Sequence, residues 1–188
     1  MCAAAAVSFR EYASRDDDQM AEWFDGEVRP LPALTPSQRA VKERLSALLG
    51  EHVELNGAGL VIEAPFAIRM PEEINHGREP DLLFVPNEFA ETLRANYVNS
   101  HGVALVVEIA DGRSRELDSV EKFDEYERAG IPEYWIVDVD RARVLVYALV
   151  GTRYARVEPD EAGVYHSLVV RGFSFAPSPL FDSHPRTL

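Results

Sequence analysis

The chain has 188 residues, of which 46% are hydrophobic and 27% charged, as expected for a globular protein long enough to form one proper core. Its formal net charge of −13 comes from 32 acidic and 19 basic residues, which makes it a poor general binder of polyanions. A role on nucleic acid would therefore require a local basic patch.

Cys2 is the only cysteine, which excludes an internal disulfide and fits a reducing compartment. The first residues lack the charged segment and the long apolar core of a signal peptide, and no apolar run reaches the length of a membrane span. We expect a single domain over residues 1–188, with a core from about 20 to 150, located in the cytoplasm.

The N-terminal part of the chain predicts one hairpin and one helix. Residues 1–18 indicate a loose start. Asp25-Gly26-Glu27 is a good turn between two short strands. Thr35-Pro36-Ser37 is typical of a helix start, and Gly50 is expected to end that helix.

The remainder of the chain predicts strands and one further helix. The expected strands are residues 60–70, 79–85, 103–110, 134–139, 144–149, 153–158 and 164–170, and the expected helix is residues 116–129. Pro65 suggests an edge strand or a bulge. The tail from residue 172 is expected to pack through Phe173, Phe175 and Phe181. This order predicts an α/β (α+β) fold, a mixed β-sheet flanked by helices with extra C-terminal β-strands.

Two of the expected strands each contain one carboxylate among apolar residues. Strand periodicity places Asp81 on one face with Leu83 and Val85, and Glu108 on one face with Val106. A carboxylate in such a strand must be paired, protonated or bound to a cation. The two acids therefore indicate a hard-metal site, or alternatively a strand cap at Asp81 and a buried ion pair at Glu108.

The helix expected after Glu108 divides its charged residues between two sides. At about 100° per residue, Asp118, Lys122 and Tyr126 lie on the inward side. The opposite side carries Glu121, Asp124, Glu125, Glu127 and Arg128. A surface pair of Asp118 with Lys122 explains this spacing, and so does a lysine that points toward the two carboxylates.

Several features together resemble a known bacterial family. They are the Glu79-Pro80-Asp81-Leu82 motif, the apolar strand that ends near Glu108, the spacing of Asp118, Lys122 and Tyr126, and the run from Ala129 to Trp135. The chain resembles the "putative restriction endonuclease" family of the PD-(D/E)XK nuclease superfamily over about Trp23 to Leu149. The resemblance implies a restriction-endonuclease-like core.

The resemblance also implies a set of roles. Asp81 and Glu108 match the two acidic positions that hold Mg²⁺, with Mn²⁺ as the alternative ion. Ala110 stands where the superfamily usually has its lysine, so Lys122 would assist the attacking water instead. Glu22 matches a further acid of the pattern. Asp118 and Tyr126 would support Lys122 from one helical turn on either side.

Substrate contacts are expected from the start of the first long helix. Gln38 stands where the family often has a histidine, and it is a candidate contact together with Arg39 and Lys42. A helix face exposed to solvent explains the positions of Arg39 and Lys42 more simply than a contact with phosphate.

Two functions follow from the resemblance. The first is a Mg²⁺-dependent endonuclease acting on DNA. We expect it to be a homodimer, because the extra C-terminal strands and the aromatic tail offer edges that a second copy would cover. The second is a non-catalytic interaction or regulatory protein that retains the nuclease fold. The Asp81, Glu108 and Lys122 set favours the enzyme, whereas the net charge and Gln38 favour the alternative.

Overall fold

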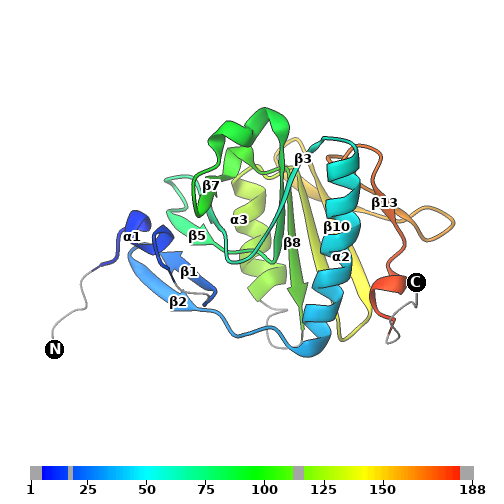
Figure 1. Ribbon diagram of the computed structural model, residues 1–188, viewed down its shortest axis with the longest axis horizontal. Coiled ribbons are helices and arrows are strands. Elements are labelled where there is room, and N and C mark those ends of the chain that lie inside the picture. Colours follow the sequence, from blue (N-terminus) through cyan, green and yellow to red (C-terminus); the bar gives the residue numbers. More distant parts are fainter. Residues whose placement is uncertain (1–5, 17–18, 112–116, 183–188) are drawn as a thin grey trace.

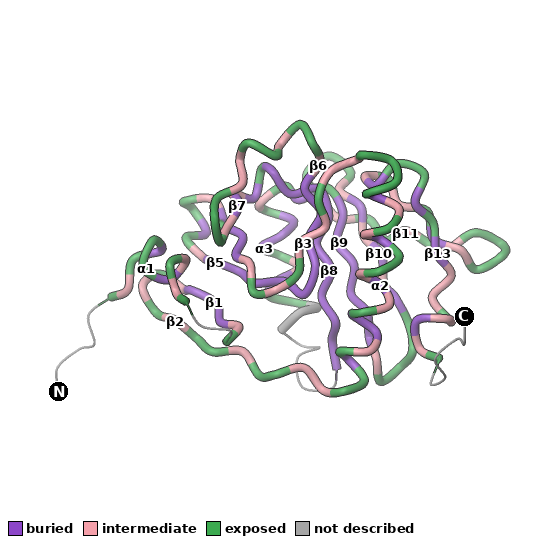
Figure 2. Tube along the Cα trace, viewed as in Figure 1, coloured by how far each residue is buried: buried purple, intermediate pink, exposed green. Residues whose placement is uncertain are grey.

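A six-stranded mixed sheet forms the centre of the molecule, in the computed structural model that describes residues 6–16, 19–111 and 117–182. Its strands, in spatial order, are β11 (Arg153–Val157), β10 (Arg143–Val150), β9 (Glu133–Asp138), β8 (Leu105–Ala110), β6 (Leu82–Pro86) and β3 (Gly59–Glu63). β8 and β9 are parallel, and the other neighbours are antiparallel. Figure 2 shows that the middle strands are buried along nearly their whole length.

Helices cover both faces of this sheet (Figure 1). On one face α2 (Pro36–Leu55) packs against Leu105, Val107 and Ile109 of β8. On the other face, a π-helical segment (Leu117–Lys122) leads into α3 (Phe123–Arg128), and Tyr126 packs beside Val106. The result is the helix–sheet–helix layering expected from the order of elements. Within the described ranges, no helix is long and apolar enough to cross a membrane.

α2 begins as the sequence predicts but ends later. Thr35 caps the helix, and Gln38 completes a capping box with it. The expected end at Gly50 is wrong, because the helix continues to Leu55. The buried side chain of Val53 extends the apolar stripe past Gly50, and this packing offsets the low helix propensity of one glycine.

A second sheet, in the order β2-β1-β5-β4-β7, lies beside the first. Its strands are β1 (Ala21–Phe24), β2 (Glu27–Pro30), β4 (Ala67–Arg69), β5 (His76–Arg78) and β7 (Tyr97–Asn99). The hairpin is confirmed, with Asp25 and Gly26 at φ of 45° and 99°, as a two-residue turn requires.

The expected loose start is wrong for the described part of residues 1–18. Ser8 caps a short helix, α1 (Phe9–Ala13), by a capping box. Phe9 and Tyr12 are buried and pack with Trp23 of β1 in a small separate core. Apolar burial of aromatic side chains therefore orders this segment.

One expected strand is divided between the sheets, and another is shorter than expected. Residues 60–70 form β3 in the large sheet and β4 in the small one, and Pro65 lies between them. Residues 79–85 do not start a strand until Leu82, because Pro80 separates β5 from β6. Proline has no N–H for a strand ladder, so both crossings occur at prolines. The two crossings touch, since the N–H of Ala64 donates to the carbonyl of Asp81 at 3.2 Å.

The C-terminal segment folds onto the α2 face of the large sheet. Phe173 and Phe175 lie near Trp135, with ring centroids 6.1 and 5.0 Å away, which confirms the expected packing of the tail. The expected strand 164–170 is largely wrong. Only β12 (Tyr165–His166) forms, paired with β13 (Ser174–Phe175), and it does not join the large sheet. The N–H groups of the next residues bond to the buried Glu133 carboxylate instead.

Short 3₁₀ segments complete the connections. They are η1 (Asn87–Thr92), η2 (Ser100–Gly102) and η4 (Ser178–Leu180). The expected helix start at Glu116 and the end of the tail lie outside the described residues.

Candidate active site

Asp81 and Glu108 lie at one end of the central sheet, on neighbouring chain segments. Asp81 directly precedes β6 and Glu108 belongs to β8, and each is 4% exposed. The antiparallel register pairs Leu82 with Val107, so the next positions, Asp81 and Glu108, stand opposite each other. The N–H of Ile109 donates to Oδ2 of Asp81 at 2.7 Å, which fixes the Asp81 carboxylate against β8.

Lys122 is buried next to Glu108. Its Nζ lies 3.0 Å from Oε1 of Glu108 and 3.1 Å from Oε1 of Glu22, and the residue is 3% exposed. The interpretation as a surface lysine is therefore wrong. The side chain of Asp118 lies outside the described residues. Lys122 joins a carboxylate from the large sheet to one from the small sheet, so the charged cluster sits where the two sheets meet.

Arg78, for which the sequence predicts no role, holds this cluster from the side of the small sheet. The fully buried guanidinium donates to Glu22 at 2.6 Å from Nη1. Its Nε and Nη2 donate to the two oxygens of Glu125 at 2.8 and 2.7 Å. Nη2 also reaches Glu121 at 3.0 Å. A bidentate fork of this kind fixes both partners in position.

Glu125 and Glu127, on the side of the helix opposite to Lys122, are also buried and are only 5% and 6% exposed. Arg78 covers Glu125, whereas the N–H of Tyr154 and the guanidinium of Arg153 bind Glu127. A helical projection gives the direction of a side chain but does not show which directions other elements cover. The one sequence signal for these pairs was Arg78, the arginine directly before the Glu79-Pro80-Asp81-Leu82 motif.

Glu22 and Arg78 each have a pKa that is shifted toward the charged form. Burial raises the pKa of Glu22, but the attraction of Lys122 and Arg78 outweighs burial and lowers that pKa overall. Burial likewise opposes the charge of Arg78, yet hydrogen bonds and attraction from Glu125 and Glu22 raise its pKa. Burying both partners of an ion pair together is tolerable only with such close hydrogen bonds.

Tyr126 orients Glu108. Its hydroxyl donates to Oε1 of Glu108 at 2.8 Å. Burial and the neighbouring Glu108 raise the pKa of Tyr126 well above its ordinary value, so the hydroxyl keeps its proton and remains a donor. Oε1 of Glu108 thus receives both this hydroxyl and the Lys122 ammonium.

Gln38 supports β8 from the other face of the sheet. The residue is buried, and its Nε2 donates to the carbonyl of Ile109 at 2.9 Å, while its Oε1 accepts from the N–H of Thr35. The amide therefore connects the start of α2 to the residue beside Glu108. A substrate contact for Gln38 stays a prediction.

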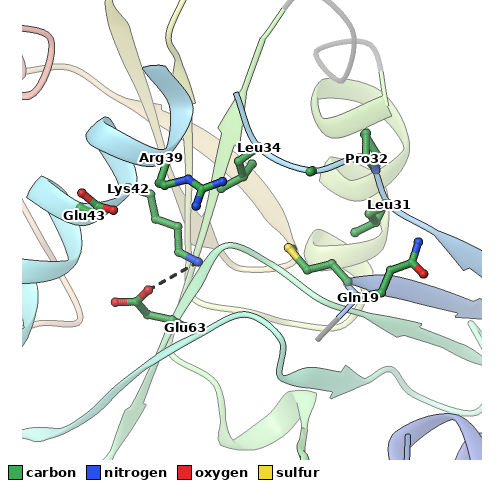
Figure 3. A pocket seen from close by; sticks show the side chains of 10 residues that line it. Gln19, Leu31, Pro32, Leu34, Arg39, Lys42, Glu43 and Glu63 are labelled. Atoms are coloured by element: carbon green, nitrogen blue, oxygen red, sulfur yellow. Dashed lines mark ion pairs between the residues drawn. The ribbon is translucent and has the colours of Figure 1, made fainter. Parts of the chain in front are cut away.

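A pocket of about 440 Å³ opens between α2 and the segment before β1. Figure 3 shows Lys42 reaching from α2 toward Glu63, and their charged groups are 3.5 Å apart. Lys42 is 8% exposed, so a solvated helix face does not explain it, whereas Arg39 is exposed at the rim.

The donor chemistry of the cluster fits a hard divalent cation. In the part of the chain that the structure describes, no group of three or more His, Cys, Asp or Glu side chains is arranged to hold a metal ion. Mg²⁺ typically takes only one or two carboxylates and completes its shell with water and substrate phosphate oxygens. Asp81 and Glu108, opposite each other on paired segments, could supply that pair.

The fold and the site together define an α/β protein whose buried acids, lysine and arginine meet at the end of a mixed sheet. The chain belongs to the Uma2 family, described as "Putative restriction endonuclease", whose model matches residues 7–178. Among solved structures, it is similar to one described as "a putative nuclease belonging to DUF820" from Anabaena variabilis. That match has a TM-score of 0.72 and 12% identity, and it covers 93% of this chain and 97% of the other. The comparison with curated proteins found no match.

Proposed function

We propose that this chain is a divalent-metal-dependent endonuclease that hydrolyses DNA phosphodiester bonds. The observation that carries the proposal is the position of Asp81 opposite Glu108, with the Lys122 ammonium 3.0 Å from the Glu108 carboxylate. The descriptions of the family and of the Anabaena protein point to the same class of activity.

Asp81 and Glu108 are the residues that would hold Mg²⁺ or Mn²⁺. Bound there, the cation would stabilise negative charge on the phosphate and lower the pKa of a water molecule. Around it, the N–H of Ile109 holds the Asp81 carboxylate and the Tyr126 hydroxyl holds Glu108, so neither must reorganise when substrate arrives.

Lys122 is the group placed to act on the water or on the developing charge. Its ammonium can donate a hydrogen bond to either, and it is oriented through Glu22 by Arg78. This arrangement supports the idea that the helix after β8 supplies the lysine that position 110 lacks.

The non-catalytic alternative also has a specific observation in its favour. Lys122 already compensates Glu108 and Glu22, so the cluster is satisfied as a structural ion network. In that case Arg78 and Lys122 join the small sheet to the large one and have no role on a substrate.

A cleavage assay decides between these two functions. The purified chain is incubated with plasmid, linear duplex and single-stranded DNA, with Mg²⁺, with Mn²⁺ or with EDTA. We expect metal-dependent cleavage that Asp81→Asn abolishes, and calorimetric binding of Mn²⁺ that the same variant weakens. Absence of cleavage on all DNAs, or full cleavage by Asp81→Asn, would contradict the proposed function.

A homodimer and a cytoplasmic location remain part of the proposal. The tail aromatics Phe173 and Phe175 are buried within the chain, so they no longer argue for a dimer. β11 still forms an edge of the large sheet, and pairing there would address both strands of a duplex. Light scattering should give twice the 21.0 kDa of one chain, and a monomer at working concentration would contradict this arrangement.

A further inference from the structure

The pocket beside α2 adjoins the charged cluster through the chain segments that form it. Met20 lies two residues before Glu22. Glu63 is paired with Leu82, the residue after Asp81. The pocket and the cluster are therefore connected through β1 and through the paired strands β3 and β6.

The walls of the pocket are apolar and its interior carries a few convergent polar groups. Met20, Leu31 and Leu34 supply apolar surface. Lys42 faces the half-exposed side chain of Glu63 across the pocket (Figure 3), and Glu63 also accepts from the hydroxyl of Ser46 at 2.5 Å. A volume of about 440 Å³ falls within the range of about 300–1,000 Å³ typical of sites for small ligands and their parts.

The charges of the lining balance. Arg39 and Lys42 are offset by Glu43 and Glu63, so the pocket offers no net attraction for a phosphate. The edge of a nucleobase presents donors and acceptors together, which suits an ammonium next to a carboxylate. The apolar walls suit the faces of the base.

From this combination we propose that the pocket receives one unpaired nucleobase of the substrate strand. The inference rests on the proposed DNA-cleaving function and deepens it, because it specifies DNA with an unstacked or unpaired base near the cleaved bond. Moving a base out of the stack costs least where it is already unpaired. Lys42 donates to the base edge, Glu63 accepts from it, and exposed Arg39 contacts the adjoining backbone at the rim.

The test compares three labelled duplexes of one sequence by fluorescence anisotropy, with Ca²⁺ in place of Mg²⁺. One duplex is fully paired, one carries a single bulged base, and one carries an abasic residue at the bulge. We expect the parent to bind the bulged base about tenfold more tightly than the other two. Leu34→Trp should fill the pocket and remove this preference, leaving affinity for the paired duplex unchanged. Lys42→Met should reduce the preference without filling the pocket.

Leu55→Trp is the matched control, because Leu55 lies at the far end of the same helix and is 79% exposed. It should retain the preference, and circular dichroism should show all variants folded. A parent without the preference, or a Leu34→Trp variant that keeps it, overturns the inference. Cleavage of paired DNA by the parent with Mg²⁺, measured in parallel, then shows that the proposed function stands. If the parent neither binds nor cuts any of these DNAs, the proposed function fails and this inference fails with it.

Discussion

Lys122 carries most of the chemistry that the chain itself would contribute. It is one of two lysines, and it lies between two buried carboxylates. Removing a buried cation leaves its partners uncompensated and can cost about 3–5 kcal/mol of stability. A truncation to alanine would remove both the charge and the hydrogen-bond donor, whereas glutamine keeps an amide donor for the two carboxylates and is the better probe.

We expect Lys122→Gln to reduce the turnover number for DNA by about 10²–10⁴-fold, because a positioned proton-transfer group is lost. Single-turnover cleavage kinetics at saturating DNA measure this effect, and circular dichroism confirms that the variant is folded. Arg153→Gln is the control, since Arg153 binds Glu127 on the same helix but its side chain is 80% exposed. Equal turnover by Lys122→Gln and the parent would show that Lys122 is not part of the reaction.

Glu22 predicts a distinct dependence of stability on pH. Its pKa in the folded protein is lowered below the ordinary value of 4.5, because Lys122 and Arg78 outweigh the effect of burial. The ionised carboxylate therefore stabilises the fold above that value, and this contribution is lost as the pH falls through the folded pKa. Glu22→Gln should be less stable than the parent at pH 7, and the difference should narrow below about pH 4.5. Urea unfolding at several pH values measures both curves, and a constant difference would contradict this role.

At the scale of elements, α2 contains a glycine with no evident function. Gly50 has an ordinary helical conformation, and a Cβ added there would meet nothing within 4 Å. Gly57, just beyond the helix, has a φ of 55° and needs its glycine. We expect Gly50→Ala to raise the free energy of unfolding by about 0.5–1 kcal/mol and Gly57→Ala to lower it. Chemical denaturation tests the pair, and a destabilised Gly50→Ala variant would reveal a contact at that position that the fold does not show.

The element that sets the site is the double crossing between the sheets. The chain leaves the large sheet at Pro65 and returns to it at Pro80, so Asp81, directly before β6, follows three residues after Arg78, the last residue of β5. The four residues from Arg78 to Asp81 thus include both the buried guanidinium of the small sheet and the Asp81 carboxylate beside the large sheet. This explains how a short motif can connect the small sheet to the end of the large one where we propose that catalysis takes place.

At the scale of the whole molecule, the net charge of −13 limits how the chain can bind DNA. Because Arg78 and Lys122, the buried cations of the described cluster, are already paired with carboxylates, we expect few phosphate contacts and a weak dependence of affinity on salt. About two or three neutralised phosphates give a slope of roughly −2 to −3 in a plot of log affinity against log salt concentration. Anisotropy titrations from low to moderate salt measure this slope. A slope near −8 would indicate a basic surface that the described residues do not form.

Sequence by itself determined the helix–sheet–helix layering, the start of α2 and the two acids on one end of the sheet. These features follow from local periodicity and capping, which depend on residues close together in the chain. Tyr126 was also placed correctly, since an aromatic residue on the inward side of a helix is normally buried.

Only the tertiary structure decided which charges meet. Arg78 and Glu125 are 47 residues apart, and Glu22 is 56 residues from Arg78, so no local pattern connects them. The helical projection placed Glu125 opposite to Lys122 but contained no information about β5 of the small sheet, whose His76 and Arg78 bind Glu125 on that side of α3. Likewise, the strand expected at residues 164–170 does not extend past His166, because the N–H groups of Leu168 and Val169 donate to the Glu133 carboxylate from another part of the chain. Burial and pairing of charges depend on contacts distant in sequence, and the folded chain alone brings those contacts together.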